Sequence, residues 1–386
     1  MKLTTDRVWI PLLVVCVLIG AAGFAVTAAG VSPLRAWESF LVNLLFWTGI
    51  AQGGVAMSAA LYLCEARWGG KGLYRLAEAA AGFLPIGFLL FWVLLAGRYF
   101  LFSWIQHPIP AKQPYLNVPF LFGRDGGGLL VMWLLSWIFI RASRSEAASN
   151  WAEEYESLDE PPSSVKRLAP VLLIAYALIY SILAVDLVMS LSPQWYSTMF
   201  GAYFTFGSFV SGIMAMALAA AMGKCPVRRD TAGERGGVLH DLGKLVFAGS
   251  TFWTYLLFAM YLVIWFGDIP KETFFAAVRV NYAPWGAVGW SAFGLIWVLP
   301  FFVLIARAPK RTPFILGFVC FSSLVGFWME RYVLIGPSLT PHRVPFGWIE
   351  ILITLGFFGA FGLATLPGLR RVPCFSLPAA ARREAA

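Results

Sequence analysis

Ten long apolar stretches, separated by polar segments, run through the sequence. A stretch of about 20 apolar residues crosses a bilayer as a helix, because a helix satisfies its backbone hydrogen bonds without water. A β-barrel would instead show short segments of alternating polarity. We therefore predict an all-α membrane protein with ten transmembrane helices, at Val8–Ala29, Glu38–Cys64, Leu76–Ile105, Val118–Ile140, Leu168–Ser190, Trp195–Met222, Leu239–Phe266, Trp285–Ala306, Pro313–Ile335 and Phe346–Leu366.

The composition agrees with this prediction and excludes several other classes of protein. Of the 386 residues, 59% are hydrophobic and 13% are charged, whereas charged residues make up roughly 25% of an average soluble domain. A water-soluble globule and a disordered chain are therefore excluded. The five cysteines are scattered without any Cys-x-x-Cys spacing, so neither an iron–sulfur cluster nor a zinc site is expected. The net charge of +9 comes from residues between apolar stretches, so no nucleic-acid partner is expected.

Lysine and arginine are distributed unequally between the two sets of connections. Twenty of them lie in the N-terminal segment, the even-numbered connections and the C-terminal segment. Five lie in the odd-numbered connections, namely Arg35, Lys112, Lys271, Arg279 and Arg343. Because cytoplasmic loops hold the excess of positive charge, both termini are predicted to be cytoplasmic. This arrangement requires an even number of spans, which agrees with ten.

Seven ionisable residues from five spans lie near the ends that are predicted to face outward. Such a side chain is costly in hydrocarbon unless it faces protein or water, so each one is a functional candidate. They are Arg98, Arg124, Asp125, Asp186, Glu330, Arg331 and Glu350. Three cations and four acids allow nearly neutral pairing, and purely structural pairing of adjacent residues remains an alternative. Asp186 has no cation beside it in its own span, so we expect it to be the main functional residue.

A second polar group lies at the inner start of the seventh span. His240 and Lys244 are four residues apart, and the same helical face continues through Thr251 to Tyr255. Together with Asp241, these residues are predicted to take up protons from the cytoplasm, because histidine titrates near neutral pH. The alternative is an ordinary helix start, in which Asp241 favours the helix dipole and Lys244 reaches the headgroups. Other polar residues considered for such a path are Glu78, Thr205, Ser208 and Ser211.

The histidine count argues against a haem carrier. The chain has three histidines, of which His107 and His342 fall in or next to outer connections and His240 lies at the other face. A transmembrane b-type haem usually takes two histidines from facing helices, and no such pair exists here. A cytochrome b core, a haem–copper core and any metal site built from this chain alone are therefore not expected.

Two similar segments suggest an internal repeat. Tyr99–Trp104 precedes an Ile-Pro pair at residues 109–110, and Tyr261–Trp265 precedes another at residues 269–270. The offset of four helices makes the two copies point the same way. It predicts two four-helix units, made of spans two to five and six to nine, at residues 38–190 and 195–335.

Six short motifs are distributed between the second span and the tenth. They are Leu116–Phe120, Asp186–Leu191, Trp195–Gly201, His240–Leu245, Tyr261–Trp265 and Ile269–Thr273. Together they resemble the membrane subunits of the NrfD/polysulfide-reductase family. The likeness is greatest to the ActF-type subunit of bacterial alternative complex III, a quinol:electron-acceptor oxidoreductase.

The resemblance implies a multi-pass subunit of a bacterial inner membrane, with two four-helix bundles among its ten helices. The outer charged residues would form a proton relay or surround a menaquinone or ubiquinone headgroup. Haem and iron–sulfur clusters are expected in partner subunits, namely an iron–sulfur subunit, c-type cytochrome subunits and a paralogous ten-helix subunit, with lipids around them. Because that paralogue resembles the better quinol-site candidate, a proton-conducting or structural role for this chain stays open.

Two hypotheses from other classes stand beside this one. A secondary transporter with a parallel repeat would place its substrate site near the bilayer centre, whereas most charges here lie near one face. A purely structural anchor would use the charged residues only to hold neighbouring subunits. Whether the chain takes part in catalysis is therefore left open at this stage.

Overall fold

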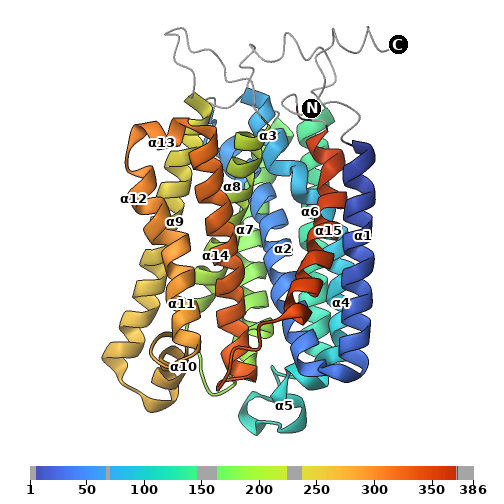
Figure 1. Ribbon diagram of the computed structural model, residues 1–386, viewed down its shortest axis with the longest axis vertical. Coiled ribbons are helices and arrows are strands. Elements are labelled where there is room, and N and C mark those ends of the chain that lie inside the picture. The colour runs from blue at the N-terminus through green and yellow to red at the C-terminus, as the bar shows by residue number, and fades with distance from the viewer. Residues whose placement is uncertain (1–5, 67–69, 146–162, 224–236, 371, 373–386) are drawn as a thin grey trace.

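The computed structural model describes residues 6–66, 70–145, 163–223, 237–370 and 372, and within these residues the regular structure is helical, without strands. Ten of the helical segments are long and apolar enough to cross a membrane, which confirms the predicted number of spans. Figure 1 shows them packed side by side as one bundle. The chain is therefore a multi-pass integral membrane protein.

The helices follow one another in the order of the apolar stretches. Their bounds are α1 Asp6–Val26, η1 Thr27–Val31, α2 Pro33–Leu63, α3 Gly70–Glu78, η3 Ala79–Phe83, α4 Leu84–Leu101, α5 Ser103–Gln106, η4 Pro110–Lys112, α6 Val118–Ser145, α7 Ser163–Leu187, η5 Met189–Leu191, α8 Phe200–Met222, α9 Gly237–Gly267, α10 Pro270–Val280, α11 Trp285–Phe293, η6 Gly294–Val298, α12 Leu299–Leu304, α13 Arg307–Arg311, α14 Pro313–Leu339 and α15 Trp348–Leu369.

Two of the ten spans are interrupted by irregular turns beside a proline. The third span consists of α3, the 3-10 turn η3 and α4, with Pro85 in the first turn of α4. The eighth consists of α11, the π-turn η6 and α12, with Pro300 in the first turn of α12. Proline has no N–H to donate to the preceding turn, so the regular hydrogen-bond ladder is broken at these points.

The two ends of the bundle differ, and we name them by what they contain. The terminal end is where α1 begins and α15 finishes, at the top of Figure 1, and the loop end is where α5 and α10 lie. The predicted excess of positive charge falls at the terminal end. Nine of these twenty lysines and arginines lie outside the described residues, four of them between Lys224 and Arg235, and Cys225 and Cys374 lie outside them as well. The cytoplasmic placement of the terminal end therefore stays a prediction.

The most buried helix, α2, forms the centre of the bundle. In its apolar window 94% of the residues are buried, against 22% for the first span, which lies at the edge beside α15. α2 packs against α4, α7, α8, α14 and α15. Its approach to α8 is close because Gly53 faces Ser208 and Gly212 faces Gly53 backbone to backbone, with no room for a side chain. Since α2 packs on helices of both predicted four-helix units, the division into these units stays a prediction.

Candidate functional site

The structure gives Asp186 the partner that its own span lacks. Arg124 of α6 donates to Asp186 Oδ2 of α7 from Nε at 2.7 Å and from Nη2 at 2.5 Å. The Asp186 side chain is fully buried and that of Arg124 is 16% exposed. Both residues lie toward the loop end of their helices, so a charge-assisted ion pair fixes α6 against α7 there.

The surroundings of this pair are aromatic and leave part of its hydrogen-bonding capacity unused. The Arg124 guanidinium lies 4.0 Å from the centroid of the Tyr115 ring and 4.4 Å from that of Phe120. Arg124 Nη1 and Asp186 Oδ1 are buried and have no hydrogen-bond partner among the described residues. Burial, followed by the nearby negative charge of Asp186, raises the pKa of Tyr115 to about 12, so this hydroxyl keeps its proton at physiological pH.

A second carboxyl group stands beside the first. Asp125, the residue after Arg124, is 1% exposed, and neither of its oxygens accepts a hydrogen bond from a described donor. It lies close enough to Asp186 for the two carboxyl groups to interact electrostatically. An ionised carboxyl group carries one negative charge, and the Arg124 guanidinium carries one positive charge. Two acids and one guanidinium are therefore electrically neutral when the acids hold one proton between them.

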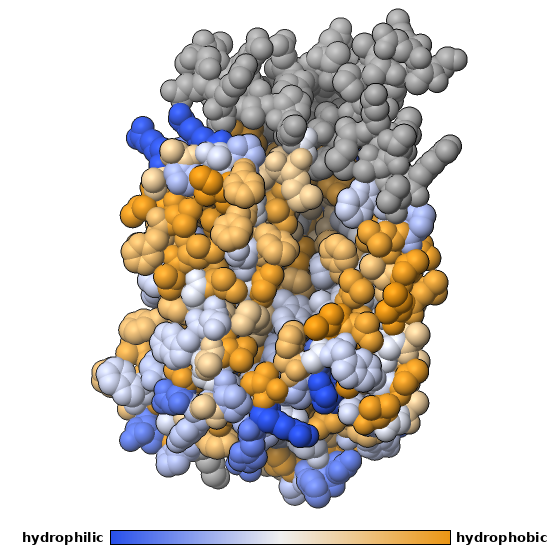
Figure 2. All heavy atoms as spheres, in the orientation of Figure 1, coloured by the Kyte–Doolittle hydropathy of each residue, from blue (hydrophilic) through white to orange (hydrophobic). Residues whose placement is uncertain are grey.

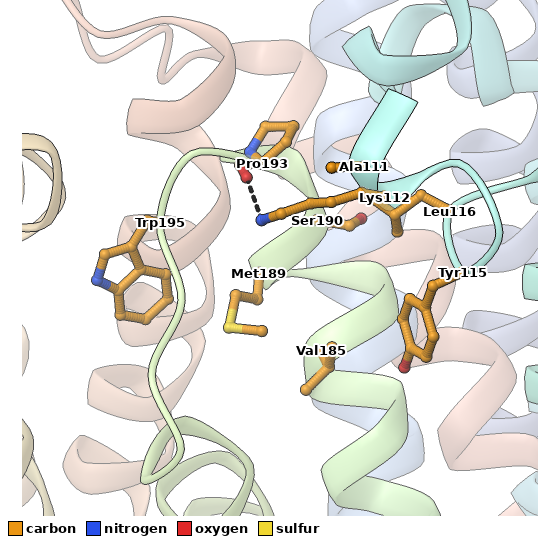
Figure 3. A pocket seen from close by; sticks show the side chains of 9 residues that line it. All are labelled: Ala111, Lys112, Tyr115, Leu116, Val185, Met189, Ser190, Pro193 and Trp195. Atoms are coloured by element: carbon orange, nitrogen blue, oxygen red, sulfur yellow. Dashed lines mark hydrogen bonds between the residues drawn. The ribbon is translucent and has the colours of Figure 1, made fainter. Parts of the chain in front are cut away.

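A pocket of about 270 Å³ lies next to this group at the loop end (Figure 3). Its polar lining includes Lys112, Tyr115 and Ser190, and its apolar lining includes Met189 and Trp195. Lys112 extends across the pocket and donates to the Pro193 carbonyl oxygen at 2.6 Å. Tyr115 and Val185, which precedes Asp186, also line the pocket, so the carboxylate is directly behind its wall.

Arg279 supports one wall of the pocket through its contact with Phe275. The sequence analysis counted this arginine among the charges of the outer connections. Trp195 stacks on Phe275, with 3.5 Å between the two ring centroids. The Arg279 guanidinium lies 3.4 Å from the centroid of the same Phe275 ring. Arg279 donates to the Leu334 carbonyl and to Ser338 Oγ at 2.7 and 2.8 Å. It is 7% exposed, and burial lowers its pKa to about 9, so it remains charged at neutral pH.

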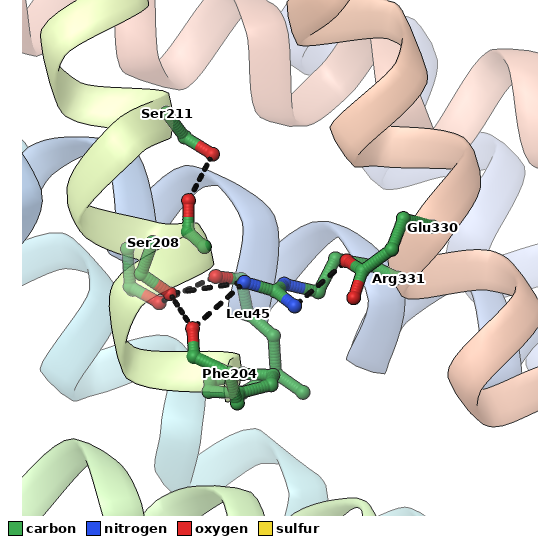
Figure 4. Close-up of polar contacts among 8 residues, drawn as sticks. Leu45, Phe204, Ser208, Ser211, Glu330 and Arg331 are labelled. Atoms are coloured by element: carbon green, nitrogen blue, oxygen red, sulfur yellow. Dashed lines mark hydrogen bonds and ion pairs between the residues drawn. The ribbon is translucent and has the colours of Figure 1, made fainter. Parts of the chain in front are cut away.

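Glu330 and Arg331 form a separate group in the interior of the bundle (Figure 4). Arg331 of α14 donates to Glu330 Oε2 at 2.7 Å, and it reaches α8, where it donates to the Phe204 carbonyl at 3.2 Å and to Ser208 Oγ at 3.1 Å. Its guanidinium also lies 3.9 Å from the Phe204 ring centroid. Both charged residues are buried, so this pair joins α14 to α8.

A third group joins α2 to α15, and two of its residues were missed by the sequence analysis. Arg35 donates to both oxygens of Glu350, at 3.1 and 2.8 Å, and the Gly347 N–H donates to the same carboxylate. Glu38, one turn after Arg35, is 1% exposed, and its oxygens lack hydrogen-bond partners in the described part of the chain. The i, i+3 spacing of Arg35 and Glu38 at the start of a span is the sequence signal that could have identified both.

The seven outer candidates therefore occupy three groups and one isolated position. Arg124, Asp125 and Asp186 lie together, Glu330 pairs with Arg331, and Glu350 pairs with Arg35. Arg98 donates to its own helix at Leu95 O and to the Tyr99 hydroxyl, and it joins none of the three groups.

At the terminal end the predicted proton-uptake residues lie toward the outside of the bundle. Lys244 pairs with Asp241 at 2.8 Å, with side chains that are 57% and 30% exposed. Thr251 donates to the Phe247 carbonyl of its own helix, and Tyr255 is 59% exposed. His240 Nδ1 has no partner among the described residues. The structure does not bring these side chains to the interior.

A buried acid at the same end lies inside the bundle instead. Glu78, at the end of α3, is 1% exposed, and its Oε1 accepts hydrogen bonds from Ser58 at 3.2 Å and from Ser143 at 3.0 Å. Arg144 Nε lies 3.5 Å from the other carboxylate oxygen. Glu78 is therefore tied to α2 through Ser58 and to α6 through Ser143 and Arg144.

Comparison with known proteins assigns the chain to a family. The sequence matches the family described as polysulphide reductase, NrfD, over residues 27–341, from η1 through the end of α14. None of the curated proteins compared with the chain matches it. In the described ranges no three His, Cys, Asp or Glu side chains come together as a metal site. Since the match covers most of the chain and all three groups except Glu350, the protein belongs to the NrfD polysulphide reductase family of membrane subunits of redox complexes.

Proposed function

We propose that this chain is a membrane subunit of a quinol:electron-acceptor oxidoreductase and that its loop-end pocket receives the quinone headgroup. One observation carries the proposal: the fully buried Asp186, held by Arg124 and close to the second buried acid Asp125, lies directly behind the wall of that pocket. An ionisable side chain inside a membrane span is a candidate functional residue, and a charged group next to a pocket is a candidate for chemistry.

The residues fit the chemistry of a quinol. Oxidation of a quinol to a quinone removes two electrons and releases two protons, so the site needs a proton acceptor and an exit for electrons. Asp186, through its unpartnered oxygen, or Asp125 accepts a proton, and Arg124 stabilises the carboxylate that remains. The electrons pass to an iron–sulfur or haem centre in a partner subunit.

The pocket also fits the shape of the ligand. Met189, Trp195 and Leu116 supply apolar surface for the ring and the start of an isoprenoid tail, while Lys112, Tyr115 and Ser190 supply hydrogen-bonding groups for its two oxygens. A pocket of about 270 Å³ is close to the lower end of the usual range for small ligands, roughly 300 Å³. It therefore suits a headgroup better than a whole quinol with its tail.

A proton path through the bundle is the second part of the proposal. Asp125, Ser136 and Ser143 are 11 and 7 residues apart on α6, about three turns and two turns, so they lie on one face of the helix. All three are buried. Gln52 donates to Ser136 at 2.9 Å, and Ser143 donates to Glu78. This polar line covers about 27 Å along the helix axis, with gaps of about 16 and 10 Å between its successive members on α6. Proton transfer along it would therefore need chains of several water molecules.

The path begins at Glu78 and ends at the Asp125–Asp186 pair, so protons would enter at the terminal end and leave at the loop end. With cytoplasmic termini this direction is outward across a bacterial inner membrane. The arrangement is the one expected for an ActF-type subunit of alternative complex III, with iron–sulfur, c-type cytochrome and paralogous membrane subunits as partners.

Replacing Asp186 tests the main proposal. In membranes that contain the intact complex, Asp186→Asn should lower quinol-dependent reduction of the electron acceptor at least tenfold, because general-base contributions are typically 10²–10⁴-fold. Asp268→Asn is the matched control, since Asp268 is an exposed acid at the same end of the bundle. Unchanged turnover in Asp186→Asn, with the complex still assembled, would contradict the proposal and favour a structural anchor.

A further inference from the structure

The group of charged residues that joins α2 to α15 at the loop end takes no part in the proposed quinone site or proton path. It consists of Arg35 and Glu38 of α2, Tyr332 of α14 and Glu350 of α15. We call these four residues the α2–α15 group. Like the group around Asp186, it contains two acids, one arginine and one tyrosine, but the two groups share no residue. Its chemistry can therefore be tested independently of the quinone site.

Arg35 is committed to one of the two acids. It donates to Glu350 from Nε at 3.1 Å and from Nη2 at 2.8 Å, and Nη2 also donates to the Pro345 carbonyl oxygen at 2.8 Å. The Gly347 N–H donates to the same carboxylate at 2.7 Å. Glu350 therefore has the counter-charge and the hydrogen bonds of an ionised carboxylate.

Glu38 has no such partners. It is 1% exposed, and both of its oxygens are buried without a hydrogen-bond donor among the described residues. The charged groups that act on it are Glu350 of α15 and Arg35 of its own helix. From α14 the Tyr332 hydroxyl faces the same acids, and it is also buried without a partner in the described part of the chain. The Trp328 ring stacks on that of Tyr332, so the surroundings are largely apolar.

The α2–α15 group needs one more positive charge to be neutral, because two ionised acids exceed one guanidinium by one negative charge. Burying that excess without hydrogen bonds costs far more free energy than burying a neutral acid. A proton or a bound cation can supply the charge. A hard cation such as Ca²⁺ takes six or more oxygen ligands, whereas the free oxygens here are those of Glu38 and the Tyr332 hydroxyl. The group therefore fits a proton.

Water can reach the α2–α15 group from the loop end. The Arg35 side chain is 26% exposed, and Figure 2 shows hydrophilic residues gathered at the loop end of this face, below a hydrophobic band. Arg35 and Glu38 are three residues apart on α2, a spacing at which an arginine and an acid can pair on one helix face. Arg35 can therefore pair with either acid, and the acid that it leaves needs the proton.

We propose that Glu38 is a second proton-exchange residue of the loop end. It holds a proton while Arg35 pairs with Glu350. When the guanidinium moves to Glu38, the O–H bond of this carboxyl group breaks, and its proton passes through loop-end water to Glu350, which has lost its counter-charge. The α2–α15 group stays neutral in both states, so the exchange leaves no uncompensated charge in the interior.

Infrared spectroscopy of the full-length chain tests this assignment, because protonated and ionised carboxyl groups absorb at separate frequencies. Spectra are recorded at neutral pH in a detergent without ester or carboxyl groups. Glu38→Gln keeps the size and neutrality of the protonated side chain, and it should lose a protonated-carboxyl signal while the carboxylate signal stays unchanged. Asp268→Asn is the control, since this exposed acid at the loop end should lose carboxylate signal alone.

Glu350→Gln tests the exchange itself. It frees Arg35 for Glu38, so the protonated-carboxyl signal of Glu38 should disappear although Glu38 is still present. A signal that persists in Glu350→Gln shows that Arg35 does not move between the acids, and it overturns the exchange role. Loss of carboxylate signal in Glu38→Gln shows that Glu38 is ionised and that the proposal is wrong. A wild-type carboxylate signal that shifts on addition of sodium, and does not shift in Glu38→Gln, assigns the site to a cation and overturns the proposal as well.

A measurement on the wild-type chain needs no substitution. When the glutamate carboxyl groups carry carbon-13, part of the protonated-carboxyl signal should shift to lower frequency, because Glu38 contributes to it. A signal that does not shift comes from aspartates alone and contradicts the proposal.

Discussion

At the scale of single residues, the buried charges differ in how completely they are hydrogen-bonded. Arg331 has an acid, a backbone carbonyl and a hydroxyl as partners, and an aromatic ring against its plane. Asp186 has one oxygen without a partner, and Asp125 has two. A fully hydrogen-bonded charge holds helices together, whereas an incompletely hydrogen-bonded acid next to a pocket is a candidate for proton exchange. We therefore assign Arg331 to stability and the two aspartates to chemistry.

This assignment predicts a stability effect at Arg331. Arg331→Met should lower the free energy of unfolding by about 3 kcal/mol, because it leaves Glu330 buried without its counter-charge. The double variant Glu330→Gln with Arg331→Met should recover most of that loss. Thermal unfolding of the purified chain in detergent measures both, with the exposed Arg343→Met as control. A double variant no more stable than the single one would show that the pair is not the source of the loss.

The sequence predicted which residues are charged within the spans but not how these residues pair. The depth of each charge followed from the spans, since an ionisable residue inside an apolar stretch is easily recognised. The partner of each charge could not be predicted in this way. Arg124 and Asp186 are 62 positions apart, and their pairing depends on how α6 and α7 are rotated about their axes. Arg35 and Arg279 were counted as loop charges, since their burial comes from packing with α15 and α14.

At the scale of elements, the rotation of a helix decides what its polar residues can do. The polar face of α9 was predicted to take up protons from the cytoplasm, and in the structure Tyr255 of this face is exposed and Lys244 lies at the surface of the chain. Sequence periodicity defines such a face but not the direction in which it points. On α6 the face with Asp125, Ser136 and Ser143 is buried, so this helix is the better candidate for a proton path.

The α6 path predicts a specific uncoupling. Ser136→Ala should lower proton uptake from the terminal side several-fold during quinol oxidation, because it removes the contact with Gln52 halfway along the path. Proton uptake and acceptor reduction are measured together in vesicles that contain the complex. Ser291→Ala is the matched control, since that exposed serine bonds only within its own helix. Equal loss in both variants, or none in Ser136→Ala, argues against the path.

At the scale of the whole molecule, the chain combines a stabilising centre with two unlike ends. The ten spans and the family could be predicted from apolar stretches and short motifs, because each of these is a local feature of the sequence. The separation of the charges into three groups could not be predicted from the sequence, because it arises from the packing of α2 against helices of both predicted units. The pocket lies at the loop end because the connection before α6 and the connection between α7 and α8 meet there. Apolar periodicity predicts helices but not the geometry of the loops between them.

Photoaffinity labelling with an azido-quinone tests the central claim most directly. When the intact complex is irradiated and digested, the label should map to residues 111–116 and 185–195 of this chain, and excess unlabelled quinol should prevent it. Asp186→Asn should weaken that labelling. Label confined to other segments of the chain, or to partner subunits alone, would show that the loop-end pocket does not receive the quinone.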